Sequence, residues 1–319
     1  MESRFAKTTE LTDKEFAGIL NLFNSIFSRS LTSDELKSQY TSTEFGFSYH
    51  SYLIENDEVI AHHAAFPSEY YINGRQALTY YTGSTMVDRR YRDGFCFLNV
   101  VKNLSLNMKQ LGFGFAFGFP NELSYKVFGK LKMCKDIGRL NIYCLPYRIG
   151  GIKKSLSLLN PFSKLFCLTW AWLNHFGGSK SVINKMIHKN DDVYNITRYN
   201  RLEQEYNHII IDGVEFYYCI KLHENVRTAF LIDVRQKSQY NFKKAVWYII
   251  KHSRNDFDLL MYIGDLDNIG SIGLIHIPGR FEPKHFYVTG ELLDKSLADE
   301  SQFYNVNNWD LNLSNYDVI

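Results

Sequence analysis

Apolar residues recur three or four positions apart near the start of the chain, over residues 12–27, and this spacing predicts an amphipathic helix. Thr12 stands at the expected N-cap of this helix and Glu15 at the capping-box position, so the start of the helix is well defined. A second, shorter helix is predicted from Thr32, because acidic residues fill its first turn.

Further along, the pattern becomes that of strands. Apolar runs at residues 52–54 and 59–66 flank a polar turn at 55–57, which predicts a β-hairpin. A further turn at residues 72–75 leads into a third predicted strand at 78–87. We expect these three strands to be antiparallel, because short turns join them.

Helices and strands then alternate along the chain. The clearest helix has apolar residues on one side between Phe97 and Leu111, and Gly112 suits its C-terminal end. The other predicted elements are a buried strand at 114–119, a helix from Asn121 to Leu131, strands at 141–145, 216–220, 229–234, 259–263 and 286–288, a connector helix that ends at Gly177-Gly178, and a helix at 242–252.

This order of elements predicts an α+β fold with a mixed, mostly antiparallel central sheet flanked by helices. A chain of 319 residues suits two domains. We expect a first domain at residues 1–148, a helical connector at 149–189 and a second domain at 190–319. The second domain repeats a weaker version of the strand–helix–strand pattern.

The composition excludes several classes of protein. The net charge of +2 argues against a broad nucleic-acid-binding surface. The five cysteines include no Cys-x-x-Cys pair, and no calcium-loop spacing is present, so we expect no metal site and no disulfide framework. The most apolar stretch, residues 165–176, is too short to span a bilayer, and the N-terminus lacks a secretory signal. These features favour a cytoplasmic protein without an integral membrane segment.

The loop at residues 88–94 is the first candidate site. Arg89, Arg90 and Arg92 precede Gly94 and the start of a helix. Backbone N–H groups and the helix dipole converge at such a junction, and the arginines add full positive charge, which together suit a pyrophosphate. The alternative is an ordinary exposed loop.

The second candidate site follows the strand at 114–119, where Asn121 precedes a helix. Asn often caps a helix for purely local reasons. The presence of both candidate sites in this order is therefore a stronger indication of function than either site alone. Asp88 ends the third strand and is either a general base or a turn cap. His63 follows His62 in a strand, and because strand neighbours face opposite sides, one of the two is a second candidate for the base.

The two sites, in this order, resemble those of the GNAT superfamily of acyl-CoA-dependent acyltransferases. The sequence Tyr-Arg-Asp-Gly-Phe-Cys at residues 91–96 resembles the family's pyrophosphate loop, although Gly94 follows Arg92 by only two residues. The downstream motif matches the family's spacing at Asn121, Ser124, Phe128 and Lys130.

The resemblance covers residues 1–145 and is closest to the tandem branch of enhanced-intracellular-survival aminoglycoside acetyltransferases, through the segment Phe-Gly-Phe-Pro-Asn-Glu and a second GNAT-like half. It implies a GNAT fold followed by a degenerate GNAT-like half, with acetyl-CoA or another acyl-CoA as the co-substrate. By position, it implies that the cofactor contacts Met86, Val87, Arg92, Asp93, Gly94, Phe95 and Asn121.

In many members of the family, a Tyr at the position of Phe128 protonates the leaving thiolate. A phenyl ring has no ionisable proton, so Tyr125, one helical turn earlier, is the candidate acid here, with Asp88 and His63 as candidates for the base. Members of the branch can also place the C-terminal carboxylate in the active site, which by position alone implies a role for Ile319.

We therefore expect an N-acyltransferase that moves an acyl group, most simply acetyl, from acyl-CoA to an amine on a small molecule such as an amino-sugar. Two alternatives stay open. A Fem-type aminoacyltransferase would need a surface for aminoacyl-tRNA, which the near-neutral charge does not support. A catalytically inactive module that binds acyl-CoA or a partner would account for Phe128 and the shortened loop. Self-association into a homo-oligomer is also left open.

Overall fold

The structure, a computed structural model, describes residues 1–92, 94–131, 134–199, 205–266, 269–282 and 284–316. The chain forms two compact units, and each is built from three separate segments. The first unit comprises Met1–Gly138, Met186–Gln204 and Tyr287–Asn308, and the second comprises Arg139–Lys185, Glu205–Phe286 and Trp309–Ile319. The segments of the two compact units alternate along the chain. The predicted division into consecutive domains, with boundaries at 148 and 189, stays a prediction.

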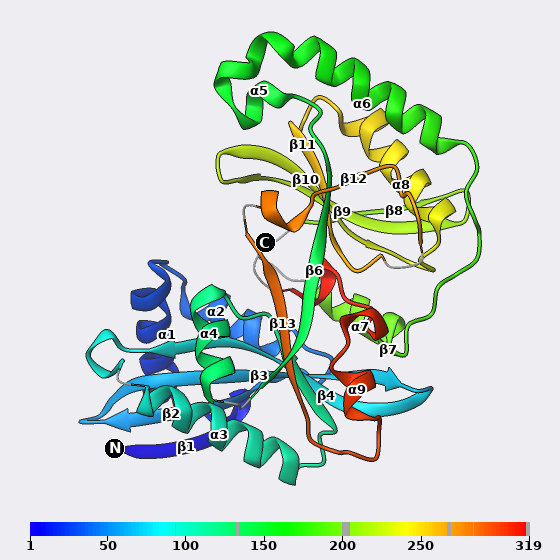
Figure 1. The fold of residues 1–319 in the computed structure, drawn as a ribbon. Helices are drawn as coiled ribbons and strands as arrows, with labels where there is room; N and C mark the ends of the chain where they lie inside the picture. The colour runs from blue at the N-terminus through cyan, green and yellow to red at the C-terminus, as the bar shows by residue number, and fades with distance from the viewer. Residues whose placement is uncertain (93, 132–133, 200–204, 267–268, 283, 317–319) are drawn as a thin grey trace. The chain divides into compact units, whose positions relative to one another are not determined.

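The first unit contains a mixed sheet in which strands β2, β3 and β4 lie side by side (Figure 1). Its strand order is β1 (Glu2–Lys7), β2 (Tyr49–Glu55), β3 (Glu58–Ile72), β4 (Arg75–Val87), β5 (Phe115–Gly118) and β13 (Phe286–Leu292), with the short β7 (Ile187–Lys189) also paired to β3. β4 and β5 are parallel, whereas the other pairs are antiparallel. The α+β fold with a mostly antiparallel sheet, as expected from the sequence, is confirmed.

Helices cover both faces of this sheet. On one face, α3 (Phe95–Gln110) packs Leu104 and Met108 into a cluster with Ala65 of β3. On the other face, Tyr40 at the end of α2 (Ser33–Thr41) packs against Phe66 of β3. Because residues 65 and 66 are neighbours on one strand, their side chains point to opposite faces. The α2 and α3 helices therefore lie on opposite sides of the sheet.

Among the described residues of the first unit, the other helices are α1 (Asp13–Phe27), α4 (Glu122–Leu131) and α7 (Asp191–Arg198), followed by the single turn α9 (Glu300–Phe303). The predicted start of α1 is confirmed, because the Thr12 side chain accepts from the Glu15 N–H while Glu15 accepts from the Thr12 N–H. Strand β1 was not predicted, since its sequence is largely polar and it lies at the exposed edge of the sheet.

The second unit has its own mixed sheet, with the order β6 (Lys135–Leu145), β11 (Leu259–Gly264), β10 (Val226–Val234), β9 (Val214–His223) and β8 (Asn207–Ile211), and with β12 (Ile275–His276) also paired to β6. β10 and β11 are parallel. Helix α8 (Gln239–Ser253) packs on α6 (Asn160–His175), which follows the single turn α5 (Ile149–Ile152) in the predicted connector (Figure 1).

The two units repeat one arrangement. In the first, β4 leads through α3 to the parallel strand β5, and in the second, β10 leads through α8 to the parallel strand β11. The antiparallel strand that pairs with the second strand of this arrangement, β5 or β11, comes in each case from the other half of the chain. β5 pairs with β13 from the end of the chain, while β11 pairs with β6, which follows β5 in sequence. Each unit therefore receives one strand from the other half.

Candidate active site

Strand β4 continues beyond its pairing with β5. The paired residues run from Thr79 to Thr82 on β4 and from Phe115 to Gly118 on β5, where β5 ends. A side chain at position 118 would collide with the Thr82 hydroxyl, so glycine allows this close approach before the chain turns away. Residues 83–87 of β4 extend past the end of β5. Backbone groups on that edge are placed to bind an extended ligand.

A β-bulge interrupts β4 in this extension. His62 lies opposite Met86 and Ala64 lies opposite Gly83, so Ser84 and Thr85 together face the single residue between them on β3. Ser84 has a φ of 48°, in the left-handed region, which costs an L-residue roughly 1–2 kcal/mol. Such strain persists only where the surroundings hold it in place.

A chain of buried hydrogen bonds holds the bulge. His62 Nδ1 is 3.0 Å from the Ser84 carbonyl oxygen, His62 Nε2 is 3.0 Å from His50 Nδ1, and His50 Nε2 is 2.9 Å from the Thr8 hydroxyl. A carbonyl only accepts, so His62 donates from Nδ1 and, when neutral, accepts at Nε2 from His50. His50 in turn accepts from Thr8. We call His62, His50 and Thr8 the histidine relay.

Burial keeps both rings of the histidine relay neutral. Both imidazoles have no exposed surface, and desolvation lowers the pKa of His50 well below its usual range and that of His62 to about 4. Their tautomers are therefore fixed at neutral pH. Because a trans peptide directs its C=O and N–H in opposite directions, a fixed Ser84 carbonyl also fixes the Thr85 N–H, which points away from His62.

The candidate base His63 lies on the opposite face of β3 from His62, as expected for neighbours on a strand. Its Nδ1 is 2.8 Å from the Thr85 hydroxyl, so the structure places it beside the bulge. Only 2% of its surface is exposed, and burial lowers its pKa to about 3. A base this weak is poorly matched to removing a proton at neutral pH.

The candidate base Asp88 caps the short 3-10 helix at Arg89–Tyr91. Its carboxylate accepts from the Arg90 N–H at 2.8 Å and forms an ion pair with the Arg90 guanidinium at 2.9 Å. These bonds hold its pKa below the usual range. Arg90 also pairs with Glu58 at 2.8 Å, so it is committed within the protein. Asp88 was expected to be either a general base or a turn cap, and in the structure its side chain caps the turn.

The loop leads into the start of α3, where Gly94 is half-buried. Gly94 is the N-cap residue, with a φ of 92°, and no described side chain caps the helix there. Arg89 and Arg92 are exposed beside it, while Met86 is buried and Phe95 is exposed. Uncapped N–H groups, the helix dipole and two exposed guanidinium groups together favour an anion. Asp93 lies outside the described residues.

The second predicted site is the start of α4. Asn121 caps this helix, since its side-chain oxygen accepts from the Ser124 N–H at 2.9 Å. Tyr125 stacks on Tyr287 with ring centroids 4.0 Å apart, and desolvation and Asp136 raise its pKa, so it keeps its proton at neutral pH. Phe128 is buried against α3. The side chain of Lys130 and all of Ile319 lie outside the described residues.

The second unit has a corresponding gap between β10 and β11. Their last paired residues are Leu231 and Tyr262, and both strands continue beyond this pair. Residues 309–315 fill the gap, and five of these seven side chains are at most 1% exposed: Trp309, Leu311, Asn312, Leu313 and Ser314. We call residues 309–315 the C-terminal plug.

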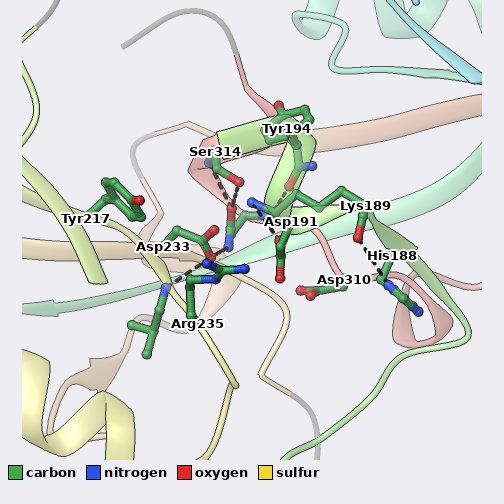
Figure 2. A network of polar contacts seen from close by, with 12 residues as sticks. His188, Lys189, Asp191, Tyr194, Tyr217, Asp233, Arg235, Asp310 and Ser314 are labelled. Atoms are coloured by element: carbon green, nitrogen blue, oxygen red, sulfur yellow. Dashed lines mark hydrogen bonds and ion pairs between the residues drawn. The ribbon is translucent and has the colours of Figure 1, made fainter. Parts of the chain in front are cut away.

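The C-terminal plug is bound on both sides. Asn312 forms a β-bridge to Gly264 of β11, and its side-chain amide donates to Asp233 of β10 at 2.6 Å. Ser314 donates its hydroxyl to Asn312 at 2.6 Å, and Figure 2 shows Asp233 and Ser314 within this network. Burial opposes the charge of Lys237, but its ion pair with Asp310 raises its pKa. The gap is thus closed by the protein itself.

Comparison with solved structures shows that the fold is that of GCN5-related N-acetyltransferases. A conserved protein of unknown function from Enterococcus faecalis, described as a candidate N-acyltransferase, matches 95% of this chain and 74% of its own length with a TM-score of 0.59 and 13% identity. A GCN5-related N-acetyltransferase from Anabaena variabilis matches 91% and 73% with a TM-score of 0.59 and 9% identity.

Eis1 from Mycobacterium abscessus matches 96% of this chain and 76% of its own length, with a TM-score of 0.56 and 11% identity. No family model matches the sequence, and no curated protein is similar to it in sequence. Among the described residues, no helix is long and apolar enough to cross a membrane, and no three His, Cys, Asp or Glu side chains gather as metal ligands.

Proposed function

We propose that this protein is an N-acyltransferase that moves an acyl group, most simply acetyl, from acyl-CoA to an amine on a small molecule. The observation that carries this proposal is the extension of β4 past β5, with a bulge held by the histidine relay and a basic loop leading into the uncapped start of α3. All of these features lie in the first unit.

Each part of this region has a role in the proposed reaction. The pantetheine arm pairs with the edge of β4 at residues 83–87, and the pyrophosphate binds at Arg92, Arg89 and the first N–H groups of α3. The Thr85 N–H donates to the thioester oxygen and stabilises the negative charge that develops there. Because this donor is fixed before the substrate arrives, little reorganisation opposes the reaction.

The leaving thiolate needs a proton, and Tyr125 is the proposed source. Its raised pKa keeps the hydroxyl protonated at neutral pH, as a general acid requires. The alternative of a binding module without turnover is favoured by one observation, the burial of Phe128 against α3. Turnover with any amine, lost in Tyr125→Phe while acetyl-CoA binding is kept, would distinguish an enzyme from such a module.

Calorimetry with acetyl-CoA tests the proposal directly. We expect micromolar binding that weakens about tenfold in Arg92→Ala, because a charge-assisted hydrogen bond to phosphate contributes roughly 1.5–3 kcal/mol. The matched control is Arg29→Ala, which removes an exposed arginine outside the loop and is expected to bind normally. If neither acetyl-CoA nor a longer acyl-CoA binds the wild-type protein, the proposal is wrong.

A further inference from the structure

The second unit exposes an apolar face on helix α6 (Asn160–His175), whose other side packs on α8 (Figure 1). The large side chains of this face are 49–71% exposed: Phe162, Leu165, Phe166, Trp172 and Leu173. We call these five residues the apolar stripe. Most of them lie three, four or seven positions apart, and a helix with 3.6 residues per turn places such positions on one side. The apolar stripe is therefore one face of α6 rather than a set of scattered side chains.

The opposite side of α6 supplies its packing within the second unit. Cys167 and Ala171 are buried in a core cluster that includes Val246 of α8. Trp170 faces the same way, because its indole N–H donates to the Gly273 carbonyl oxygen at 3.1 Å. The core of the second unit thus uses the inner side of α6 and leaves the apolar stripe uncovered. An exposed apolar patch of this kind marks a surface that binds a partner or a membrane.

Basic residues surround the apolar stripe, and acidic residues are absent from its segment. Residues 149–185 contain five lysines and no Asp or Glu, although the whole chain has 34 acidic residues. Lys153 and Lys154 are exposed where the 3-10 helix before α6 begins, and Lys180 is exposed beyond the end of α6. Lys164 lies at the border of the apolar stripe, since it directly precedes Leu165. The surroundings of the stripe are therefore positively charged and suit a negatively charged partner.

This combination of residues favours a lipid surface over a protein. Lysine is depleted in interfaces between proteins, whereas a helix with Trp, Phe and Leu on one face and lysines around it is typical of binding at the surface of a membrane. The flexible stem of a lysine also lets its ammonium group reach the headgroups while the apolar side chains enter the bilayer. At about 24 Å, a 16-residue helix is shorter than the hydrocarbon core of a bilayer, so α6 suits a position along the surface.

We propose that the apolar stripe binds the surface of a membrane that contains anionic lipids, with α6 parallel to the membrane plane. The stripe enters the boundary between headgroups and acyl chains, and Lys153, Lys154 and Lys164 contact the lipid phosphates. Because α6 belongs to the second unit and the proposed cofactor site to the first, this binding goes beyond the proposed function and does not depend on it.

The test is co-sedimentation of the full-length protein with vesicles of equimolar phosphatidylcholine and phosphatidylglycerol, beside vesicles of phosphatidylcholine alone. We expect binding to the anionic vesicles that is about tenfold tighter than to the neutral ones and that weakens as salt screens the lysines. No binding to the anionic vesicles would overturn the proposal. Equal binding to both kinds of vesicle would also overturn it, because the lysines would then have no part in the interaction.

Matched variants test the two parts of the surface. Leu165→Glu should weaken binding about tenfold or more, because a carboxylate would enter an apolar layer near anionic lipid. The control is Leu222→Glu, at a leucine of the same unit that is 68% exposed on β9 and is expected to bind normally. Replacing both Lys153 and Lys154 by Gln should weaken binding more than replacing both Lys37 and Lys102, which are exposed in the first unit. Equal effects within either comparison would contradict the assignment to α6.

Tryptophan fluorescence reports whether the apolar stripe enters the bilayer. Of the four Trp residues, Trp172 is exposed and the other three are buried or half-buried, so vesicle binding should shift its emission to shorter wavelength. Trp172→Phe should keep binding and lose this shift, whereas an unchanged shift would contradict insertion of the stripe. Light scattering without lipid examines self-association. A wild-type dimer that becomes a monomer in Leu165→Glu would show that a second copy covers the stripe, and would overturn the proposal.

Discussion

The two gaps, one beside β4 and the other between β10 and β11, come from the same strand–helix–strand arrangement. They differ in what occupies them. In the first unit, residues 83–87 extend past β5, and Gly94 precedes α3 without a described side-chain cap. In the second, residues 309–315 fill the gap and Ser238 caps α8. The gap that the protein fills with its own chain cannot also hold a ligand.

The two gaps differ in whether their strand edges and helix starts are bonded within the protein. Both gaps offer strand edges and a helix start, which are the groups that bind extended anionic ligands. In the second unit those groups are satisfied by Asn312 and Ser238. Apolar burial of Trp309, Leu311 and Leu313 then stabilises the unit, at roughly 1.5–3 kcal/mol for each large side chain. The same geometry contributes stability in one unit and is left for function in the other.

The largest expected effect comes from removing the centre of the C-terminal plug. Trp309 has no exposed surface, so Trp309→Ala should lower the free energy of unfolding by about 3–5 kcal/mol. Chemical denaturation measures this change. The control is Trp172→Ala, at a side chain that is 50% exposed and is expected to have little effect. An unchanged free energy of unfolding in Trp309→Ala would show that the C-terminal plug does not stabilise the second unit.

The next effect is on the histidine relay of the first unit. His62→Ala leaves the Ser84 carbonyl and His50 Nδ1 without their partner, which should cost about 3 kcal/mol of stability. If the relay aims the Thr85 N–H, kcat should also fall about 100-fold with little change in acetyl-CoA affinity. His62→Asn keeps a donor near the position of Nδ1 and should recover part of the lost kcat. Equal losses in both variants would argue for a purely structural role.

A pH titration examines the same relay. The folded pKa of His62 is about 4, below the ordinary value of 6.5, so the unfolded chain binds a proton first as the pH falls. The neutral relay thus contributes stability above pH 6.5 that is lost progressively as the pH falls towards 4. We expect this loss to be smaller in His62→Asn. If the free energy of unfolding falls with pH to the same extent in the wild type and in His62→Asn, His62 is not the source of the loss.

The smallest expected effect concerns the helix starts. The Ser238 hydroxyl accepts from the Asn241 N–H at 3.2 Å, so Ser238→Ala should lower stability by about 1 kcal/mol. Acetyl-CoA affinity should not change, because the C-terminal plug still fills the second gap. A second acetyl-CoA site in this variant, seen as a changed stoichiometry in calorimetry, would contradict the assignment of the ligand to the first unit.

Local elements could be predicted from the sequence because local rules determine them. The capping box at Thr12, the cap at Asn121 and the β4–α3–β5 order follow from spacing and side-chain chemistry within a few residues. The strand β1 was missed because it lies at an edge, where a polar sequence is tolerated.

The rest of the site depends on contacts between residues far apart in sequence. The bulge at Ser84 requires a positive φ that no local motif indicates. The link between His50 and His62 depends on the register of β2 against β3, in which His62 lies opposite Tyr52, so that the two histidines share a face. The plug at residues 309–315 has an ordinary polar and apolar composition. Nothing in it identifies the gap that it fills.

The exchange of β6 and β13 has a consequence for synthesis of the chain. β5 ends at Gly118, but its antiparallel neighbour is β13, which ends at Leu292. At about 5–20 residues per second, a ribosome needs roughly 10–35 s to make the intervening chain. During that time a nascent β5 has an open edge, which is the kind of surface that chaperones protect. The first unit to be translated is therefore completed only by one of the last strands to emerge.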